Sequence, residues 1–185
     1  MLAFVFWHWP YPQIDVRFYE QGLREFHANL ARTRPQGFVK SAVFRSSGAA
    51  WAVAEHRPYE DWYVVESAAS LDPLNEGAVQ APAKESHDRA AQAAASGTGG
   101  LYQLKAGGPD LLATRFATWL AKPRETSYRD FYSQLAPWSD LPGVSLWRRY
   151  LVLGPTPEFT LLSPGDLELP TSLGGVGVSL ELVWP

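Results

Sequence analysis

Two segments in different halves of the chain share one pattern, and this repeat is the strongest constraint on the fold. Leu23–Leu30 reads LREFHANL, and Tyr128–Leu135 reads YRDFYSQL. When Phe26 is laid on Phe131, Arg falls on Arg, Glu on Asp, His on Tyr, Asn on Gln and Leu on Leu. Aligned positions that keep their physical class in this way indicate a repeated structural unit.

The flanks of the two segments support the repeat. In the first half an apolar stripe runs at helical spacing and follows Asp15, which is a suitable N-cap; its members are Val16, Tyr19, Leu23, Phe26 and Leu30. In the second half Thr126 is the expected cap. Both predicted helices follow a strand that ends at a proline, and both precede a Pro/Gly turn and another strand. The same order of elements on both sides predicts an internal duplication.

The first half contains signals for further elements, because aromatic and β-branched runs alternate with turn residues and helix formers. Ser96–Gly100 is rich in glycine and is expected to form a turn. The predicted strands are Leu2–Trp9, Phe38–Arg45, Ala49–His56, Asp61–Ser67 and Leu101–Ala106, and two helices are predicted near Pro73 and at Pro82–Ser96.

The second half repeats this order in a shorter form. Ser163–Gly175 is rich in Pro, Gly and Ser, so a loop is expected where the first half has its later helices. The predicted strands are Thr114–Ala121, Val144–Leu153, Glu158–Ser163 and Gly177–Trp184.

Each half therefore approximates the ferredoxin-like unit, strand-helix-strand-strand-helix-strand, and the predicted fold class is α+β. The expected division is 1–107 and 110–185. An antiparallel sheet with helices on one face leaves its other apolar face bare, at a cost of about 10 kcal/mol if it stays wet. The two units are therefore expected to pack sheet to sheet.

With these elements in this order, the chain resembles the dimeric α+β-barrel superfamily. The resemblance rests on element order and on the duplicated helix, and no catalytic signature of a particular family is present. It implies a small-molecule pocket between sheet and helices or inside the barrel. It also implies activities such as those of metal-free monooxygenases, EthD-like proteins, lactone isomerases and haem enzymes. Homodimerisation is a further expectation from the resemblance.

Composition excludes several classes of function. The 185 residues carry a formal net charge of −3 and no block of basic residues, so no nucleic-acid partner is expected. The absence of cysteine excludes disulfides and zinc–thiolate sites. No apolar run is long enough for a membrane helix, and the N-terminus does not have the pattern of a secretory signal, so a cytoplasmic location is the expectation.

His8 is the main candidate for a catalytic residue. In a strand it shares a face with Phe4 and Phe6, while Trp7 and Trp9 point to the opposite side. A histidine among aromatic side chains can act as a general base, because its pKa lies close to neutrality. The alternative is a half-buried histidine bonded to backbone. Trp7 and Trp9 are candidate ligand-binding residues.

The other candidates rest on weaker signals. His27 aligns with Tyr132, which suggests a side chain packed on the helix flank with its polar tip outward. The remaining ligand-binding candidates are Trp51 and Arg149, where an inward arginine would bind an anion. Glu55 and Glu66 are carboxylates in predicted strands, and they are either acids of raised pKa or edge charges. His56 and His87 are expected in a loop and on a solvated helix face.

No metal site is predicted, because the four histidines show none of the spacings of metal-binding motifs. No cofactor is predicted either, although haem, which needs a single histidine, stays open. The sequence thus favours a small, largely apolar ligand in a barrel or sheet cavity, with metal-free monooxygenase- or EthD-like chemistry as one possibility. The alternatives are a non-catalytic ligand sensor and a protein-interaction module.

Overall fold

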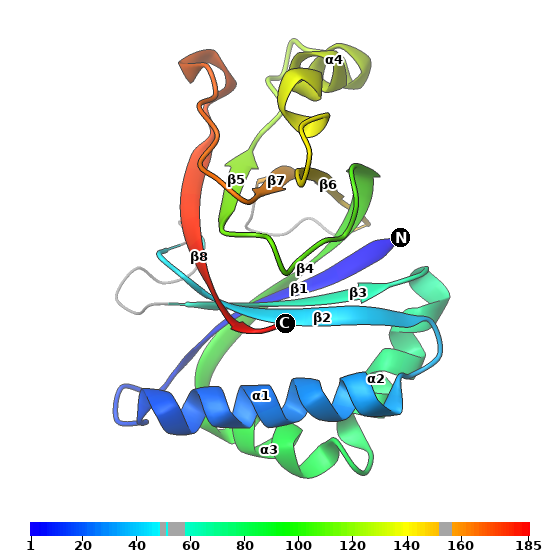
Figure 1. The fold of residues 1–185 in the computed structure, drawn as a ribbon, viewed down its shortest axis with the longest axis vertical. Helices are drawn as coiled ribbons and strands as arrows, with labels where there is room; N and C mark the ends of the chain where they lie inside the picture. Colours follow the sequence, from blue (N-terminus) through cyan, green and yellow to red (C-terminus); the bar gives the residue numbers. More distant parts are fainter. Residues whose placement is uncertain (49–50, 52–57, 152–156) are drawn as a thin grey trace.

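Two sets of four strands join edge to edge in this protein. The computed structural model describes residues 1–48, 51, 58–151 and 157–185 (Figure 1). The first half contains β1 (Leu2–Pro10), α1 (Val16–Thr33), β2 (Phe38–Ser46), β3 (Tyr59–Val65), α2 (Leu71–Val79), α3 (Lys84–Ala93) and β4 (Ala94–Ala106). The second half contains β5 (Phe116–Leu120), α4 (Tyr128–Ser139), β6 (Ser145–Arg149), β7 (Phe159–Ser163) and β8 (Val176–Trp184).

All the strand pairs are antiparallel, and the strands close into a barrel in the order β1-β3-β2-β8-β5-β7-β6-β4. Within this ring the first half runs β4-β1-β3-β2 and the second half runs β8-β5-β7-β6. The two halves therefore share one strand order, and they are joined through the β2–β8 and β4–β6 pairs. The α+β class is confirmed, and the two sheets form one closed barrel.

The barrel interior is filled by large side chains. Each strand contributes residues from its inward face to one apolar cluster. Trp7, Trp62, Trp119, Trp147 and Tyr102 are all fully buried there. The central cavity that the resemblance suggested is thus occupied by tryptophan and tyrosine rings.

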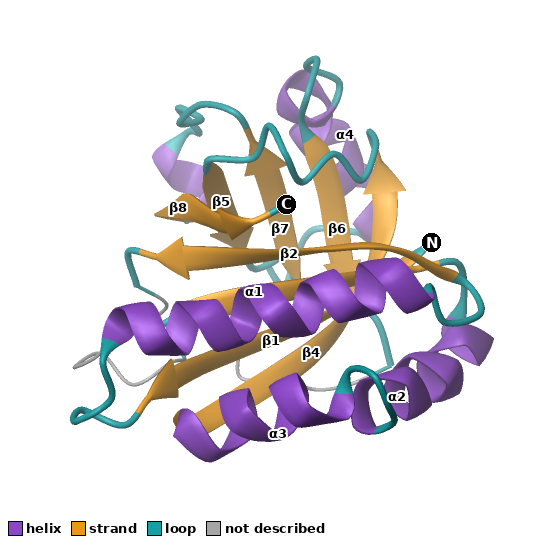
Figure 2. Ribbon diagram, turned by 60° about the horizontal axis from the view of Figure 1, so that its bottom comes forward, coloured by secondary structure: helices purple, strands orange, loops and turns teal. Residues whose placement is uncertain are grey.

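The helices lie outside the barrel. In Figures 1 and 2 the helices α1, α2 and α3 cover the first-half strands. Helix α4 lies over the second-half strands. Separate apolar clusters fill these two layers. In the described part of the chain, no helix combines the length and the apolar character needed to cross a membrane.

Strand β4 differs most from the sequence prediction. Ser96–Gly100, expected to form a turn, lies within this strand, and helix α3 ends at Ala93. The reason is tertiary: Phe4 and Phe6 of β1 lie over glycines of β4, and a Cβ added at Gly99 would lie 2.9 Å from the Phe4 ring. Glycines that look like turn residues in the sequence instead leave room for neighbouring aromatic rings.

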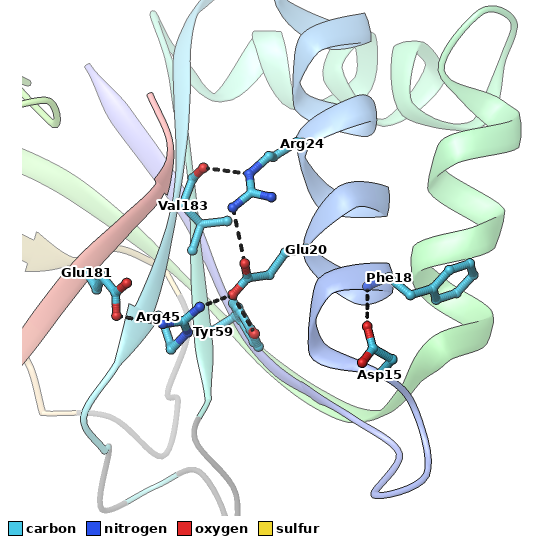
Figure 3. A network of polar contacts seen from close by, with 8 residues as sticks. All are labelled: Asp15, Phe18, Glu20, Arg24, Arg45, Tyr59, Glu181 and Val183. Carbon is cyan, nitrogen blue, oxygen red and sulfur yellow. Dashed lines mark hydrogen bonds and ion pairs between the residues drawn. The ribbon is translucent and has the colours of Figure 1, made fainter.

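Three other local predictions have different outcomes. The N-cap of α4 is Ser127, whose side chain accepts a hydrogen bond from the Asp130 backbone, so the prediction of Thr126 was wrong by one residue. The predicted strand Ala49–His56 lies outside the described residues, apart from Trp51 in a turn. The N-cap Asp15 is confirmed, since its carboxylate accepts from the Phe18 backbone (Figure 3).

An ion network fastens α1 to both halves of the barrel (Figure 3). Glu20 of α1 is buried and contacts Arg24, Arg45 and the Tyr59 hydroxyl, which donates at 3.0 Å. Arg45 of β2 also pairs with Glu181 of β8 at 2.6 Å. Because Glu20 has little access to water, these donors supply the compensation that its negative charge needs.

Candidate functional site

A cavity of about 550 Å³ lies between the first-half sheet and its covering helices. Apolar side chains from β1, α1, α2, α3 and the start of β4 make up most of its wall. They are Phe4, Phe6, Leu23, Phe26, Leu30, Leu71, Leu74, Ala78, Ala90, Ala91 and Ala94. Polar side chains gather at one part of this wall, namely His8, Tyr19, Asp61 and Tyr63.

The alternation of β1 decides which of its side chains reach the cavity. Phe4, Phe6 and His8 point outward and line it, whereas Trp7 and Trp9 point into the barrel. The predicted sidedness of this strand is therefore correct. The glycines of β4 contribute as well, because they let the Phe4 and Phe6 rings lie against the strand as part of the cavity wall.

His8 is 2% exposed and has a partner at each ring nitrogen. Nδ1 lies 2.5 Å from the Tyr19 hydroxyl. Nε2 lies 3.0 Å from Asp61 Oδ1. This second contact has the distance of an ion pair but not the alignment of a hydrogen bond, so its attraction is mainly Coulombic. The ring also stacks between Phe6 and Tyr59, which fixes its orientation.

Asp61 joins His8 to a second histidine. Its Oδ2 lies 3.3 Å from His27 Nε2 and accepts a hydrogen bond from the Tyr63 hydroxyl at 2.9 Å. On the far side of His27, Nδ1 lies 2.8 Å from Ser41 Oγ. One buried carboxylate from β3 thus holds side chains from β1 and α1 in a single network.

The electrostatics of this network favour an ionised Asp61. Burial by itself would raise the pKa of Asp61, but the positive charges that His8 and His27 carry when protonated, with the hydrogen bond to His27, outweigh it and lower the pKa. Burial, with the negative charge of Asp61, raises the pKa of Tyr19 and of Tyr63, so both phenols keep their protons.

These protonation states indicate where the protons lie between Tyr19, His8 and Asp61. Because Tyr19 keeps its proton, its hydroxyl can donate to Nδ1 of His8, and the proton of the neutral ring then lies on Nε2, beside Asp61. If the ring takes up a second proton, Asp61 stabilises the imidazolium. This is the chemistry of a general base that is oriented by a carboxylate.

Three further polar residues line other parts of the cavity. His87 of α3 packs against Phe26 with ring centroids 5.4 Å apart. Asp72 and Asn75 of α2 are exposed and lie at the rim. His87 was expected to be on a solvated face, but it is half-buried and lines the cavity. No Lys or Arg is present among the described residues of the lining.

The structure does not bring the predicted ligand-binding residues together. Trp7, Trp9 and Trp51 all belong to the apolar cluster of the barrel interior or pack against it, away from the cavity lining. Arg149 ends β6, pairs with Tyr102 in the β4–β6 ladder and does not line the cavity. Among the predicted catalytic and ligand-binding residues, which are His8, Trp7, Trp9, His27, Trp51 and Arg149, His8 alone lines this cavity.

His27 differs from its prediction in orientation. It is fully buried, and both of its ring nitrogens have partners, so the expected outward polar tip is wrong. His27 contacts Asp61 but is not itself part of the cavity lining. Glu66 is exposed beyond the end of β3. Glu55 and His56 lie outside the described residues.

Sequence reasoning missed Asp61, Tyr19 and Tyr63. A signal for the two β3 residues was present: in the run YEDWYVV, alternation places Asp61 and Tyr63 on one face and Trp62 on the other. No sequence signal showed that this face meets His8. That juxtaposition follows from the β1–β3 register, in which Phe6 pairs with Asp61 and His8 with Tyr59.

Among the described residues, no group of three or more His, Asp or Glu side chains is arranged to hold a metal ion. Haem also fits poorly on His8, because both of its ring nitrogens already have partners. Axial ligation of haem iron by His8 would require one of these contacts to break.

Comparisons with known proteins show similarity in fold. The chain matches no family model and no curated protein. Among solved structures, it resembles a protein from Lactobacillus acidophilus provisionally named a monooxygenase, with a TM-score of 0.61 and 8% identity over 98% of this chain and 94% of that one. It also resembles an anthrone oxidase-like protein, with a TM-score of 0.53 and 10% identity over 97% and 72% of the two chains.

A third solved structure, provisionally named a chlorite dismutase, has a TM-score of 0.49 and 10% identity over 87% of this chain and 77% of that one. At these identities the comparisons establish the fold alone. The chain has an α+β-barrel fold similar to that of the first two structures, with both sheets of the barrel supplied by one polypeptide.

Proposed function

We propose that the cavity binds a small, largely apolar molecule and that His8, oriented by Asp61, removes a proton from it in a metal-free monooxygenation. The observation that carries this proposal is the 3.0 Å contact between His8 Nε2 and Asp61 Oδ1 in the wall of an apolar cavity. A buried carboxylate beside one ring nitrogen holds a histidine in one tautomer and stabilises the imidazolium that forms when the other nitrogen takes a proton.

The first step is proton transfer to His8. A substrate with an acidic C–H or O–H displaces the Tyr19 hydroxyl from Nδ1, or reaches Nδ1 through it, and its proton passes to the ring. The imidazolium lies beside Asp61, whose negative charge stabilises it. Surrounding phenyl and alkyl groups exclude water from the site, which strengthens this electrostatic interaction.

The oxidation then uses molecular oxygen as co-reactant. The substrate carbanion gives one electron to O₂, the two radicals combine, and His8 returns its proton to form a hydroperoxide. Loss of water from the hydroperoxide leaves a ketone, so a CH₂ group and O₂ become C=O and H₂O. The protein has to supply only the base, the dry cavity and the orientation.

The fold comparisons are compatible with this proposal, since similar structures carry the names monooxygenase and anthrone oxidase-like. These names describe the other proteins. For this chain, the geometry of His8 and Asp61 supports the proposed reaction.

Anthrone is a suitable probe, because its CH₂ group is acidic and its oxidation to anthraquinone is visible by absorbance. We expect oxygen uptake above the buffer rate, and a loss of about a hundredfold or more in His8→Ala. Asp61→Asn should lose less, since the base remains. Circular dichroism and thermal melting would establish that both variants are folded. Full activity in His8→Ala would contradict the assignment of the base, and oxygen uptake at the buffer rate in the wild-type protein would contradict the reaction.

A non-catalytic ligand sensor is the second candidate. It is favoured by the 2.5 Å contact between Tyr19 and His8 Nδ1, which leaves no unoccupied ring nitrogen to act as a base. In that case a ligand would bind without oxygen uptake. Tyr19→Phe distinguishes the two functions, because it frees Nδ1: a base should keep or gain activity, and a sensor should stay inactive.

We also infer that the two halves arose by duplication of one ferredoxin-like unit, with 1–107 and 110–185 as the repeats. The shared strand order of the halves supports this inference. Superposition of the two units with corresponding strands out of register would contradict it. Self-association into a homodimer is a separate proposal, which sedimentation velocity would test.

A further inference from the structure

We infer that the cavity selects uncharged aromatic ligands that donate a hydrogen bond, and that it rejects carboxylates and phosphates. This inference rests on the proposed ligand-binding role of the cavity. It adds the chemical class of the ligand, which follows from the charges, rings and hydrogen-bond acceptors of the lining.

The charges of the lining are one-sided. Asp61 lies in the wall and Asp72 at the rim, with no Lys or Arg among the described lining residues. The two lining histidines already have carboxylate partners, since His8 lies 3.0 Å from Asp61 and His87 lies 3.2 Å from Asp88. The basic residues of α3 are already paired: Arg89 contacts Glu25 at 2.6 Å, and Lys84 contacts Asp88. An anionic ligand would leave water without gaining a counter-ion, and it would face the negative charge of Asp61.

Nearly parallel aromatic rings make up part of the cavity wall. Phe4 and Phe6 are nearly parallel, with an interplanar angle of 15° and centroids 6.3 Å apart. The Tyr63 ring continues this surface, stacked 6.2 Å from Phe4, and Phe26 borders it. Such a wall complements a planar ring system better than a branched aliphatic ligand, because offset stacking brings both ring faces into contact.

The polar end of the cavity presents acceptors. The Tyr19 proton is directed to His8, which leaves the lone pairs of its oxygen for a ligand. Asp61 Oδ2 already accepts from Tyr63 and approaches His27. A ligand hydroxyl or N–H would therefore find an acceptor, whereas a ligand group that can only accept would be left without a donor.

Three naphthalene derivatives that share one ring system separate these requirements. They are 2-naphthol, which is uncharged at pH 7 and donates a hydrogen bond; 2-methoxynaphthalene, which cannot donate; and 2-naphthoate, which is an anion. Calorimetric titration of the full chain should give the tightest binding for 2-naphthol, with each of the other two weaker by about tenfold or more.

A matched pair of variants tests the role of charge. Asn75→Lys places a cation at the cavity rim, whereas Gln80→Lys makes the same chemical change at an exposed site beyond the end of α2 and outside the lining. We expect Asn75→Lys to raise the affinity for 2-naphthoate severalfold relative to the affinity of the same variant for 2-naphthol. Gln80→Lys should alter neither affinity at physiological salt, since screening limits the range of its charge.

The outcomes separate the inference from the proposal on which it rests. If 2-naphthoate binds the wild-type protein as tightly as 2-naphthol, the selection against anions is wrong while the binding cavity stands. If 2-methoxynaphthalene matches 2-naphthol, the requirement for a donor is wrong. If none of the three compounds binds, the binding role of the cavity fails, and the inference fails with it.

Discussion

The outer faces of the two half-barrels have the same strand order and different contents. In the first half, the layer under α1, α2 and α3 encloses a cavity with a buried polar network. In the second half, Phe131 and Leu135 of α4 are fully buried in an apolar cluster against β5, β6 and β7. A smaller pocket of about 340 Å³ lies at the edge of that layer, near Trp138 and Leu173.

The strand ladders allow a comparison position by position. Trp7 pairs with Glu60 in the first half, and Trp119 pairs with Thr160 in the second. The next residue of each strand points outward, so His8 corresponds to Leu120 and Asp61 corresponds to Leu161. All four side chains are buried. The proposed base and its carboxylate in one half are thus replaced by two leucines in the other.

This difference shows where functional information lies in such a fold. The ring of strands tolerates either a polar network or an apolar cluster on its outer face, provided that each is internally satisfied. Two covering helices, α2 and α3, also have no helical counterpart of similar length between β7 and β8. The cavity accordingly occurs where the helical layer is wider and the β1 and β3 side chains are polar.

The aligned phenylalanines of the two helices should differ most in their contribution to stability. Phe131→Ala should lower the free energy of unfolding by about 4 kcal/mol, because it opens a void in a fully buried cluster. Phe26→Ala should cost about 2 kcal/mol, because this ring already borders the cavity and loses fewer contacts. Urea denaturation of both variants measures the difference, and equal losses would contradict the contrast between the layers.

A second prediction concerns Glu60. This residue occupies the position in β3 that Thr160 occupies in β7, since each is paired with a tryptophan of the neighbouring strand. Burial raises the pKa of Glu60 to about 7 from 4.5, although a hydrogen bond from Trp62 opposes the shift. The folded protein keeps this proton where the unfolded chain has lost it, so stability should fall as pH rises from 4.5 to about 7. The expected loss is about 3 kcal/mol.

Glu60→Gln should remove this component of the pH dependence, and Glu66→Gln at an exposed site is the control. Stability curves measured at several pH values would show the difference. An unchanged slope in Glu60→Gln would mean that the carboxyl group titrates alike in the folded and unfolded chains.

A third prediction concerns variants in which His8 and Asp61 are replaced by leucine, the residue found at the corresponding positions of the second half. Asp61→Leu should cost about 2 kcal/mol, because Tyr63 and the two histidines lose their shared acceptor inside the protein. Adding His8→Leu should cost less than the sum of the single changes, by about 1 kcal/mol, since the two groups interact directly. Chemical denaturation of the two single variants and the double variant completes the cycle, and strict additivity would contradict the coupling.

The smallest effect is expected at the two helix starts, where the halves agree. Asp15 accepts from the Phe18 backbone at 3.0 Å, and Ser127 accepts from the Asp130 backbone at 3.1 Å. Asp15→Ala and Ser127→Ala should each lower stability by about 1 kcal/mol. Thermal melts would compare them. A loss at only one helix start would show that the repeated caps are not energetically equivalent.

Much of the fold could be predicted because its signals are local. The apolar stripe of α1, the cap at Asp15 and the alternation of β1 each depend on residues that are close in sequence. The same alternation correctly separated His8 from Trp7 and Trp9. It did not distinguish a turn from a strand at Ser96–Gly100, because the use of those glycines depends on rings from another strand.

The amino-acid sequence by itself thus determined most of the element order and placed His8 on the opposite face of its strand from Trp7 and Trp9, since helical and strand periodicities act over a few residues. Only the tertiary structure decided that the barrel interior is filled with tryptophan and that the cavity lies beneath the helices. It also decided that Asp61 meets two histidines. These outcomes depend on strand register and on packing between segments far apart in the chain, which no local pattern encodes.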